Sequence, residues 1–253
     1  MTLLHNKTAL VTGSSRGIGA EIAVNLASKG AAVVVNYRQK ARRADTVVQR
    51  ITAAGGRAVA VGADLTVQDE ITVLTSAAIE NFGSLDLLVL NASGGMEAGM
   101  GHDYALKLNR DAQVNMLDAA VPLMPEGSRI LFVTSHQAHF INSVPTSSDY
   151  EPVARSKRAG EDALRDHIPA LERRGIDLVI VSGDVIEGTT MTMLLERSSP
   201  GAVEARRMLA GRLYSVTEFA SLVSAMATAD VKSGHIEFVG GSSHMKRQSQ
   251  SHL

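Results

Sequence analysis

The chain has 253 residues, of which 45% are hydrophobic and 20% are charged. This composition supports a sizeable core and excludes global disorder, and one large α/β domain can accommodate the whole length. The 25 basic residues balance 26 acidic ones, so the net charge of -1 leaves no excess to neutralise nucleic-acid phosphates. The lack of cysteine excludes disulfides, thiolate nucleophiles and cysteine metal sites, as suits a reducing cytoplasm.

Membrane and metal partners are not expected either. No apolar run approaches the roughly 18–20 residues that a bilayer span needs. The first seven residues carry no long apolar stretch, so no signal peptide is expected. No spaced set of His, Asp and Glu indicates a metal site. We therefore expect a cytoplasmic protein whose partners include neither nucleic acid nor a membrane.

Short apolar runs alternate with amphipathic segments along the chain. Most of the runs are continuously apolar, as in strands buried on both faces of a parallel sheet. Several helical segments end at a glycine suited to a left-handed cap, namely Gly30, Gly55, Gly83 and Gly175. The alternation predicts an α/β doubly wound, Rossmann-type parallel sheet with helices on both faces. Its seven strands are expected at 8–12, 32–36, 58–62, 85–91, 130–135, 178–182 and 236–239, and helices at 20–29, 41–54, 67–82, 104–124, 156–172 and 217–228.

One domain is expected to span residues 1–244, followed by a flexible tail at 245–253. Two stretches interrupt its rhythm: a serine-rich polar loop at 142–149, and residues 188–212, which follow an apolar strand. Met191, Met193, Leu194 and Leu195 in the second stretch fit either a lid over an apolar substrate or ordinary core packing. Loops beyond the carboxyl ends of strands are where open α/β sheets bind ligands.

The first expected strand leads directly into a glycine-rich turn and then into a helix. The run from Thr12 to Gly19 reads Thr-Gly-Ser-Ser-Arg-Gly-Ile-Gly, a T-G-x-x-x-G-x-G spacing. Glycines in such a turn let the backbone approach a pyrophosphate, and the free N–H groups of the following helix face the anion. A glycine triplet alone is weak evidence, but its place between the first strand and the first helix predicts a dinucleotide site.

This spacing resembles the short-chain dehydrogenase/reductase family, and the resemblance extends over nearly the whole chain. The positions that match the family are Asp64-Leu65 after the third strand, the segment 91–94 with two departures, Asn109, Ser135, Lys157, Ser182-Gly183 in place of Pro-Gly, and 239–241. The resemblance implies a single-domain oxidoreductase that acts on a small-molecule ketone. It also implies a homo-oligomer, a tetramer or a dimer, formed through the segments 104–124 and 156–172.

The expected cofactor is NADP(H). An acidic side chain after the second strand would bind the ribose 2′-hydroxyl and repel a 2′-phosphate, but this strand ends Asn36-Tyr37-Arg38, and Arg16 lies in the glycine turn. Two guanidinium groups favour a phosphate dianion, although the basic residues of 38–43 also fit a solvated helix start. The cofactor contacts that the resemblance implies are Gly13, Ser15, Arg16, Gly17, Ile18, Gly19, Tyr37, Arg38, Ala63, Asp64, Leu65, Asn91, Ala92, Ser93, Lys157, Gly183, Val185, Ile186 and Thr189.

The catalytic group departs from the family at one position. In the family, a serine hydroxyl polarises a carbonyl, a tyrosine protonates it, and a lysine four residues later holds the nicotinamide ribose and favours tyrosinate. Lys157 fits the lysine, but Val153 stands where the tyrosine should be. Tyr150 lies on the same helical stripe, about 10.5 Å from Lys157 along the axis instead of about 6 Å. Pro152 indicates a helix start at 151–153, so Tyr150 can fold back towards the cleft.

Three hypotheses follow for the proton donor. Tyr150 replaces the missing acid and acts with Ser135, Lys157 and Asn109; or the substrate, a water or Ser135 relays the proton; or catalysis is lost and an NADP(H)-sensing or interaction protein remains. His136 and His139 follow Ser135 in sequence. Histidines after a strand are more often solvated than catalytic, so neither receives a role.

A narrower resemblance concerns the substrate. The stretches 150–161 and 182–189 resemble an atypical actinobacterial branch of the family, which includes ketoreductases of angucycline-type aromatic polyketides such as the 6-ketoreductases. This resemblance implies NADPH-dependent reduction of a carbonyl on a bulky, apolar, polycyclic aromatic substrate. A 3-oxoacyl-type reductase is the alternative enzyme.

Overall fold

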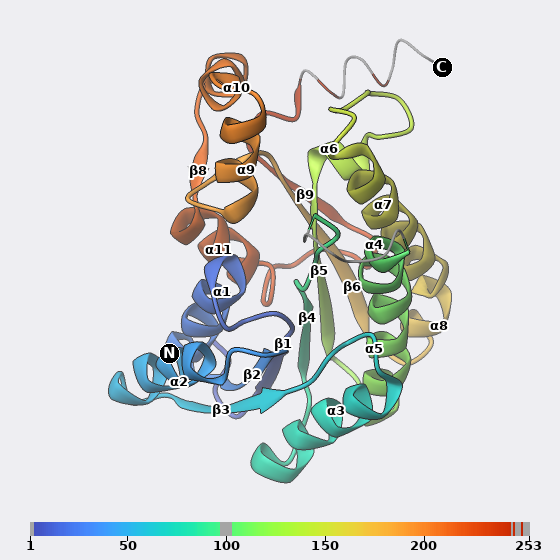
Figure 1. The fold of residues 1–253 in the computed structure, drawn as a ribbon. Helices are drawn as coiled ribbons and strands as arrows, with labels where there is room; N and C mark the ends of the chain where they lie inside the picture. The colour runs from blue at the N-terminus through green and yellow to red at the C-terminus, as the bar shows by residue number, and fades with distance from the viewer. Residues whose placement is uncertain (1–2, 97–102, 244, 246–248, 250–253) are drawn as a thin grey trace.

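The computed structural model describes residues 3–96, 103–243, 245 and 249. Its centre is a parallel sheet with the strand order β3-β2-β1-β4-β5-β6-β9 (Figure 1). The chain reverses direction across the sheet between β1 and β4, which is where open α/β sheets bind ligands. The seven strands, all expected from the sequence, are β1 (Thr8–Val11), β2 (Ala32–Tyr37), β3 (Arg57–Gly62), β4 (Leu87–Leu90), β5 (Arg129–Ser135), β6 (Asp177–Gly183) and β9 (Ile236–Val239).

Helices cover both faces of the sheet (Figure 1). Because successive strand residues point to opposite faces, Ala9 and Val33 lie in one buried cluster while Leu10 and Val34 lie in the other. The four glycines expected to cap helices, Gly30, Gly55, Gly83 and Gly175, all have positive φ angles, for example 100° at Gly30. The first cluster packs under α1 (Gly17–Ser28), α2 (Ala41–Ala53) and α11 (Val216–Ala225), and the second under α3 (Gln68–Phe82), α5 (Ala112–Ala120), α7 (Glu151–Asp166) and α8 (Ile168–Glu172).

Two of the expected helices are divided into shorter elements, whereas the others differ from their predicted bounds by three residues or fewer. The segment 104–124 divides into α4 (Tyr104–Leu106), a π-helical turn η1 (Lys107–Asp111), α5 and a 3-10 turn η2 (Val121–Leu123). A Cβ atom on Gly160 of α7 would lie only 2.0 Å from the Asn109 carbonyl oxygen, so α7 packs tightly against the π turn. The other helix begins at Glu151, next to Pro152, and breaks into α7 and α8 before Pro169.

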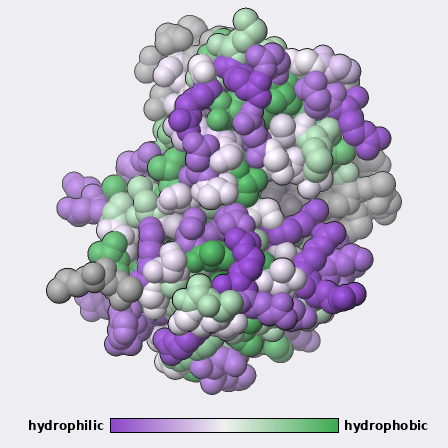
Figure 2. Space-filling model, turned by 90° about the vertical axis from the view of Figure 1, so that its left-hand side faces the viewer, coloured by the Kyte–Doolittle hydropathy of each residue, from purple (hydrophilic) through white to green (hydrophobic). Residues whose placement is uncertain are grey.

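Residues 186–215 form a substructure above the carboxyl end of the sheet, where the sequence left a lid or ordinary core packing open for residues 188–212. β7 (Ile186–Glu187) pairs with β8 (Tyr214–Ser215), and α9 (Thr190–Ser198) and α10 (Ala202–Ala210) lie between them. Figure 2 shows the face that includes this substructure as largely hydrophilic, with hydrophobic side chains exposed among the polar ones.

At the carboxyl terminus, Met245 is buried with Phe140 and Val144 and packs against the partly buried Phe238, although the sequence predicted a flexible tail from Met245 onwards. Residues 246–248 and 250–253 of that expected tail lie outside the described residues. Within the part of the chain that the structure describes, no helix has the length and hydropathy needed to cross a membrane.

Candidate active site

A cavity of about 860 Å³ opens at the carboxyl ends of the strands. Its wall includes every cofactor-contacting residue expected from the sequence, together with Ser135, Tyr150 and Lys157. Asn109 is not among the described residues that line it. The fold therefore brings one continuous surface together from segments that lie far apart in the sequence, such as those of Gly13 and Phe219.

The glycine turn forms one end of the cavity. No described side chain caps the N-terminus of α1, so the first N–H groups of the helix are free to meet an anion. Gly17 has a φ of 58°, and a Cβ atom there would meet nothing within 4 Å, so its backbone is open to the cavity. Thr12 fixes the turn against β4, because its hydroxyl accepts hydrogen bonds from the N–H groups of Asn91 (2.9 Å) and Ala92 (3.0 Å).

Asn36 occupies the end of β2, and its side chain faces inwards. Its amide oxygen accepts a hydrogen bond from the Gly13 N–H (3.0 Å), and its amide nitrogen donates to the Ala63 carbonyl (3.2 Å). The amide therefore braces the glycine turn against the loop after β3. This bracing role was not expected from the sequence, in which Asn36 stood out only as the absence of an acid, although its position at a strand end is compatible with such a link.

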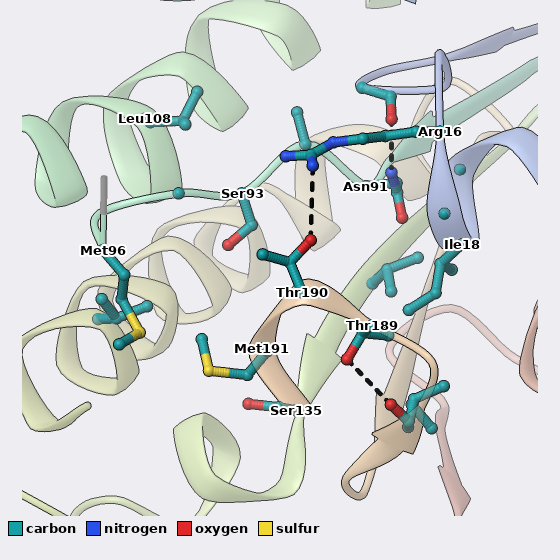
Figure 3. Close-up of a pocket in the computed structure, with 18 of the residues that line it drawn as sticks. Arg16, Ile18, Asn91, Ser93, Met96, Leu108, Ser135, Thr189, Thr190 and Met191 are labelled. Carbon is teal, nitrogen blue, oxygen red and sulfur yellow. Dashed lines mark hydrogen bonds between the residues drawn. The ribbon is translucent and has the colours of Figure 1, made fainter. Parts of the chain in front are cut away.

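Two arginines line this end of the cavity. Arg16 donates to the Thr190 hydroxyl (3.4 Å) at the start of α9, across the opening (Figure 3). Arg38 donates to the Tyr104 hydroxyl and lies 5.8 Å from the centre of its ring. Lys40 and Arg43 also line the wall, which makes this end of the cavity cationic. Such a surface suits a phosphate dianion.

Ser135 and Tyr150 meet at the other end of the cavity. Ser135 ends β5 opposite Gly183 of β6, and its hydroxyl oxygen lies 3.4 Å from the Tyr150 hydroxyl. Tyr150 immediately precedes α7 and is 7% exposed, so its side chain turns back into the fold, as its position before Pro152 had suggested. Because these two hydroxyl groups lie close together on one cavity wall, both can contact a single carbonyl oxygen.

Val153 and Lys157 lie further along α7 on the same wall. Val153 packs with Ala138, Ile141 and Tyr150 in a small apolar cluster, against which Met191 also packs. The position where the family has its tyrosine is therefore a hydrophobic part of the wall. Lys157 lines the cavity one turn beyond Val153, where its ammonium can reach a bound ligand.

Asn109 sits behind the wall, in the π turn. Its amide nitrogen donates to the Gly94 carbonyl (2.8 Å) and to the Ser156 hydroxyl (2.9 Å), and its amide oxygen accepts from the Gly94 N–H (3.2 Å). All these bonds tie the loop after β4 to α7. In this structure the Asn109 side chain thus joins the cofactor end of the site to the helix that carries Lys157.

His136 is buried and His139 is largely shielded from water, so the expectation that both are solvated is wrong. His136 is 0% exposed, its Nδ1 lies 2.8 Å from the Ser182 hydroxyl, and burial lowers its pKa from 6.5 to about 4. His139 Nδ1 lies 2.7 Å from a carboxylate oxygen of the buried Glu161. Burial would raise the pKa of Glu161, but the His139 hydrogen bond and the charges of His139, Arg165 and Arg158 hold it below the ordinary value. These contacts tie α6 (His136–His139) to β6 and α7.

The substrate end of the cavity is mostly apolar, with a few polar groups. Figure 3 shows Met96, Met191 and Ser135 around this space, with Leu108 further back. Met191, Leu194 and Leu195 line the cavity, as expected for a lid. Met193 is not among the described lining residues and is 58% exposed, so its side chain points outwards. Ser147 and Asp149, from the polar loop 142–149 noted in the sequence, also line this end. Met96, Leu108 and Gln137 line it too and were not expected, although Gln137 lies only two residues after Ser135.

The fold and the cavity together define a dinucleotide-binding α/β protein with a serine and a tyrosine hydroxyl beside the binding site. Comparison with known proteins gives the family. The family model described as short chain dehydrogenase matches residues 7–199. An uncharacterised oxidoreductase of Methylorubrum extorquens is 34% identical over 238 residues, which cover 92% of this chain and 94% of that protein. The chain therefore belongs to the short-chain dehydrogenase family and is an oxidoreductase of that family.

Other relatives are more distant or match a shorter part. A hydroxynaphthalene reductase-like protein of Metarhizium majus is 39% identical over 168 residues, which cover 64% of this chain and 61% of that protein. A short-chain dehydrogenase of Burkholderia cenocepacia in complex with NADP has a TM-score of 0.81 at 31% identity, covering 94% of this chain and 98% of that one. The reductase LugOII, which catalyses keto-reduction at C1 during lugdunomycin biosynthesis, has a TM-score of 0.76 at 28% identity, covering 93% and 96%.

Proposed function

We propose that this protein is an NADPH-dependent ketoreductase in which Tyr150, not the residue four before Lys157, is the proton donor. The observation that carries the proposal is the 3.4 Å separation of the Ser135 and Tyr150 hydroxyl oxygens on the cavity wall. A general acid must lie within hydrogen-bond reach of the group that it protonates. Tyr150 satisfies this requirement beside the polarising serine, although it reaches the site from a different point in the sequence.

The residues at the glycine-turn end fit NADP(H). The uncapped start of α1 suits the pyrophosphate, and Arg16, Arg38 and Arg43 suit the 2′-phosphate. Asn36 does not repel that phosphate as an acidic residue would. The complex of the Burkholderia cenocepacia relative with NADP supports this choice.

The proposed reaction divides the work between the cofactor and the side chains. When bound, NADPH supplies the hydride for the carbonyl carbon and becomes NADP⁺. The Ser135 hydroxyl donates a hydrogen bond to the carbonyl oxygen, and Tyr150 transfers its phenolic proton to that oxygen as negative charge develops. Lys157 holds the cofactor ribose, and its positive charge stabilises the tyrosinate that remains. Asn109 keeps the loop after β4 in register with α7.

The proposed substrate is a bulky, apolar ketone with a polycyclic aromatic skeleton, of the kind found in aromatic polyketides. Met96, Leu108, Met191, Leu194 and Leu195 give the substrate end an adaptable apolar lining. The hydroxynaphthalene reductase-like relative and the keto-reduction by LugOII support this class of substrate. Following the family resemblance, we further propose that the chain works as a homo-oligomer.

The test measures NADPH oxidation by stopped-flow absorbance with fused-ring aromatic ketones, a small aliphatic ketone and a 3-oxoacyl thioester. We expect turnover with the fused-ring ketones. Turnover only with the thioester would reassign the protein to 3-oxoacyl reduction. Tight NADPH binding without turnover of any substrate would contradict the proposal and favour a cofactor-sensing protein.

A further inference from the structure

The α9–α10 substructure meets the sheet through one buried ion pair. Arg206 of α10 donates from Nε to Asp184 Oδ1 (2.7 Å) and from Nη2 to Asp184 Oδ2 (2.9 Å). The side chains are only 13% and 3% exposed. Asp184 directly follows β6 and lines the cavity. A paired, bidentate contact of this kind has a fixed geometry, and removal of one buried partner leaves the other charge uncompensated.

Other contacts of α10 show why this pair matters. Apart from the shielded Arg206, the residues of α10, all of them described, are half-buried or exposed, so burial of apolar side chains contributes little to holding the helix in place. Arg206 Nη2 also donates to the Gly241 carbonyl (3.2 Å), and a Cβ atom on Gly241 would lie 2.6 Å from Ala210 Cβ. The helix thus rests directly on the backbone after β9. Arg207 pairs with Glu187 and Glu204 as well, but these side chains are exposed and such pairs contribute little.

The position of α10 is transmitted to the cavity through α9. The Glu196 carboxylate of α9 accepts hydrogen bonds from the N–H groups of Gly201 (2.7 Å) and Val203 (3.2 Å), at the start of α10. The opposite side of α9 supplies Met191, Leu194 and Leu195 to the cavity wall. A continuous series of contacts therefore runs from Asp184 through Arg206 and Glu196 to the apolar lining.

We propose that Arg206 is a positioning residue for large substrates: its ion pair with Asp184 holds α10, and through Glu196 the apolar side of α9, over the substrate end of the cavity. This inference rests on the proposed function for the identity of the substrate. A small ketone needs only Ser135, Tyr150 and the cofactor, whereas a fused-ring ketone also needs the lining of α9. Arg206 should therefore affect the two substrates differently.

The experiment compares Arg206→Met with Arg206→Lys and with Arg197→Met, a control at an exposed arginine on α9. For Arg206→Met we expect the KM of a fused-ring ketone to rise about tenfold. Its kcat, the KM of a small ketone and the NADPH Kd should change by no more than about twofold. Arg206→Lys should recover part of the loss, and Arg197→Met should behave as wild type. An equal rise for both ketones, or weaker NADPH binding, would mean general destabilisation and overturn the proposal.

Hydrogen exchange of the α9 amides, followed by mass spectrometry with NADPH present, gives a readout that does not depend on turnover. Faster exchange in Arg206→Met, and intermediate exchange in Arg206→Lys, are expected. Unchanged exchange in both variants would overturn the proposed anchor. If the wild-type protein reduces no ketone while the exchange result holds, the proposed function fails and the mechanical link from Arg206 to α9 remains.

Discussion

The glycine-turn end of the cavity and its catalytic end are built from different kinds of group. At the first end, backbone N–H groups of α1 and side chains that directly follow β1, β2 and β4 face the cavity. At the second end, Tyr150 and Ser135 come from separate segments and meet only through the fold. The first end follows the family pattern in sequence, while the second keeps a tyrosine hydroxyl beside the serine from a new position. Proton transfer requires a hydroxyl oxygen at a particular place in the site, and residues at different positions in the sequence can supply it.

The largest effect is expected for Tyr150→Phe, which removes the hydroxyl group at the catalytic end. If Tyr150 is the proton donor, turnover should fall by about 10²–10⁴-fold, the usual contribution of general acid catalysis. The NADPH Kd should stay unchanged, because Tyr150 lies at the catalytic end. Stopped-flow turnover and isothermal titration measure the two quantities. Near-full turnover in this variant, combined with its loss in Ser135→Ala, would instead point to a proton from water or from the substrate.

Lys157→Ala tests the one side chain expected to serve both ends. Turnover with saturating cofactor should fall by about 10²-fold, and NADPH should bind about tenfold more weakly, because one ammonium group stabilises both the ribose contact and the tyrosinate. Lys157→Arg, which keeps the charge, should lose less. Turnover within about twofold of wild type would show that the family alignment of α7 is wrong.

Acid should weaken the structure behind Ser135. Buried His136 has a pKa of about 4 in the folded state and an ordinary value of 6.5 when unfolded. The unfolded chain therefore binds a proton first, and stability is lost as the pH falls from 6.5 towards 4. Between pH 7 and pH 5 this residue should remove about 2 kcal/mol from the free energy of unfolding. Urea unfolding of His136→Asn should show a decrease smaller by that amount, whereas His5→Asn, at an exposed histidine, should match wild type.

At the glycine-turn end, Arg38→Asp should change cofactor choice. We expect the wild-type protein to bind NADPH at least about tenfold more tightly than NADH, about 1.4 kcal/mol. The substituted carboxylate should reverse or abolish the preference, because it repels the 2′-phosphate and accepts a hydrogen bond from a 2′-hydroxyl. Isothermal titration with both cofactors measures the effect. Equal wild-type affinities would remove the basis for assigning NADP(H).

How much could be predicted from the sequence also differs between the two ends. Continuous apolar runs predicted all seven sheet strands, and the short turns after them placed the expected cofactor residues on the cavity wall. Such turns are encoded locally, by glycines and by the start of the next helix. Two-residue strands such as β7 and β8 are too short to show an alternation of apolar and polar residues. The sequence therefore did not predict the substructure that they form above the sheet.

Burial of the histidines depended on residues distant in sequence. The ring centre of Phe238, on β9, lies 5.6 Å from that of His136, and Ser182 of β6 supplies its hydrogen-bond partner. Nothing near residue 136 indicates either neighbour. The Ser135–Tyr150 contact has the same character: the sequence offered it as one of three hypotheses, because only the path of the chain between 139 and 150 decides whether the two hydroxyls meet.

The smallest expected effect separates two adjacent residues of α9. The sequence placed both Met193 and Leu194 in a stretch that fits a lid or core packing, but Leu194 lines the cavity while Met193 is 58% exposed. Leu194→Glu should raise the KM of a fused-ring ketone by about three- to tenfold, because the ligand would have to desolvate a carboxylate. Met193→Glu should leave it unchanged, since its side chain stays in water. Equal effects from the two substitutions would mean that charge on α9 acts at long range or that the helix is turned differently in the complex. A difference confined to Leu194 would show that the apolar wall, and not the charge of the helix, selects the substrate.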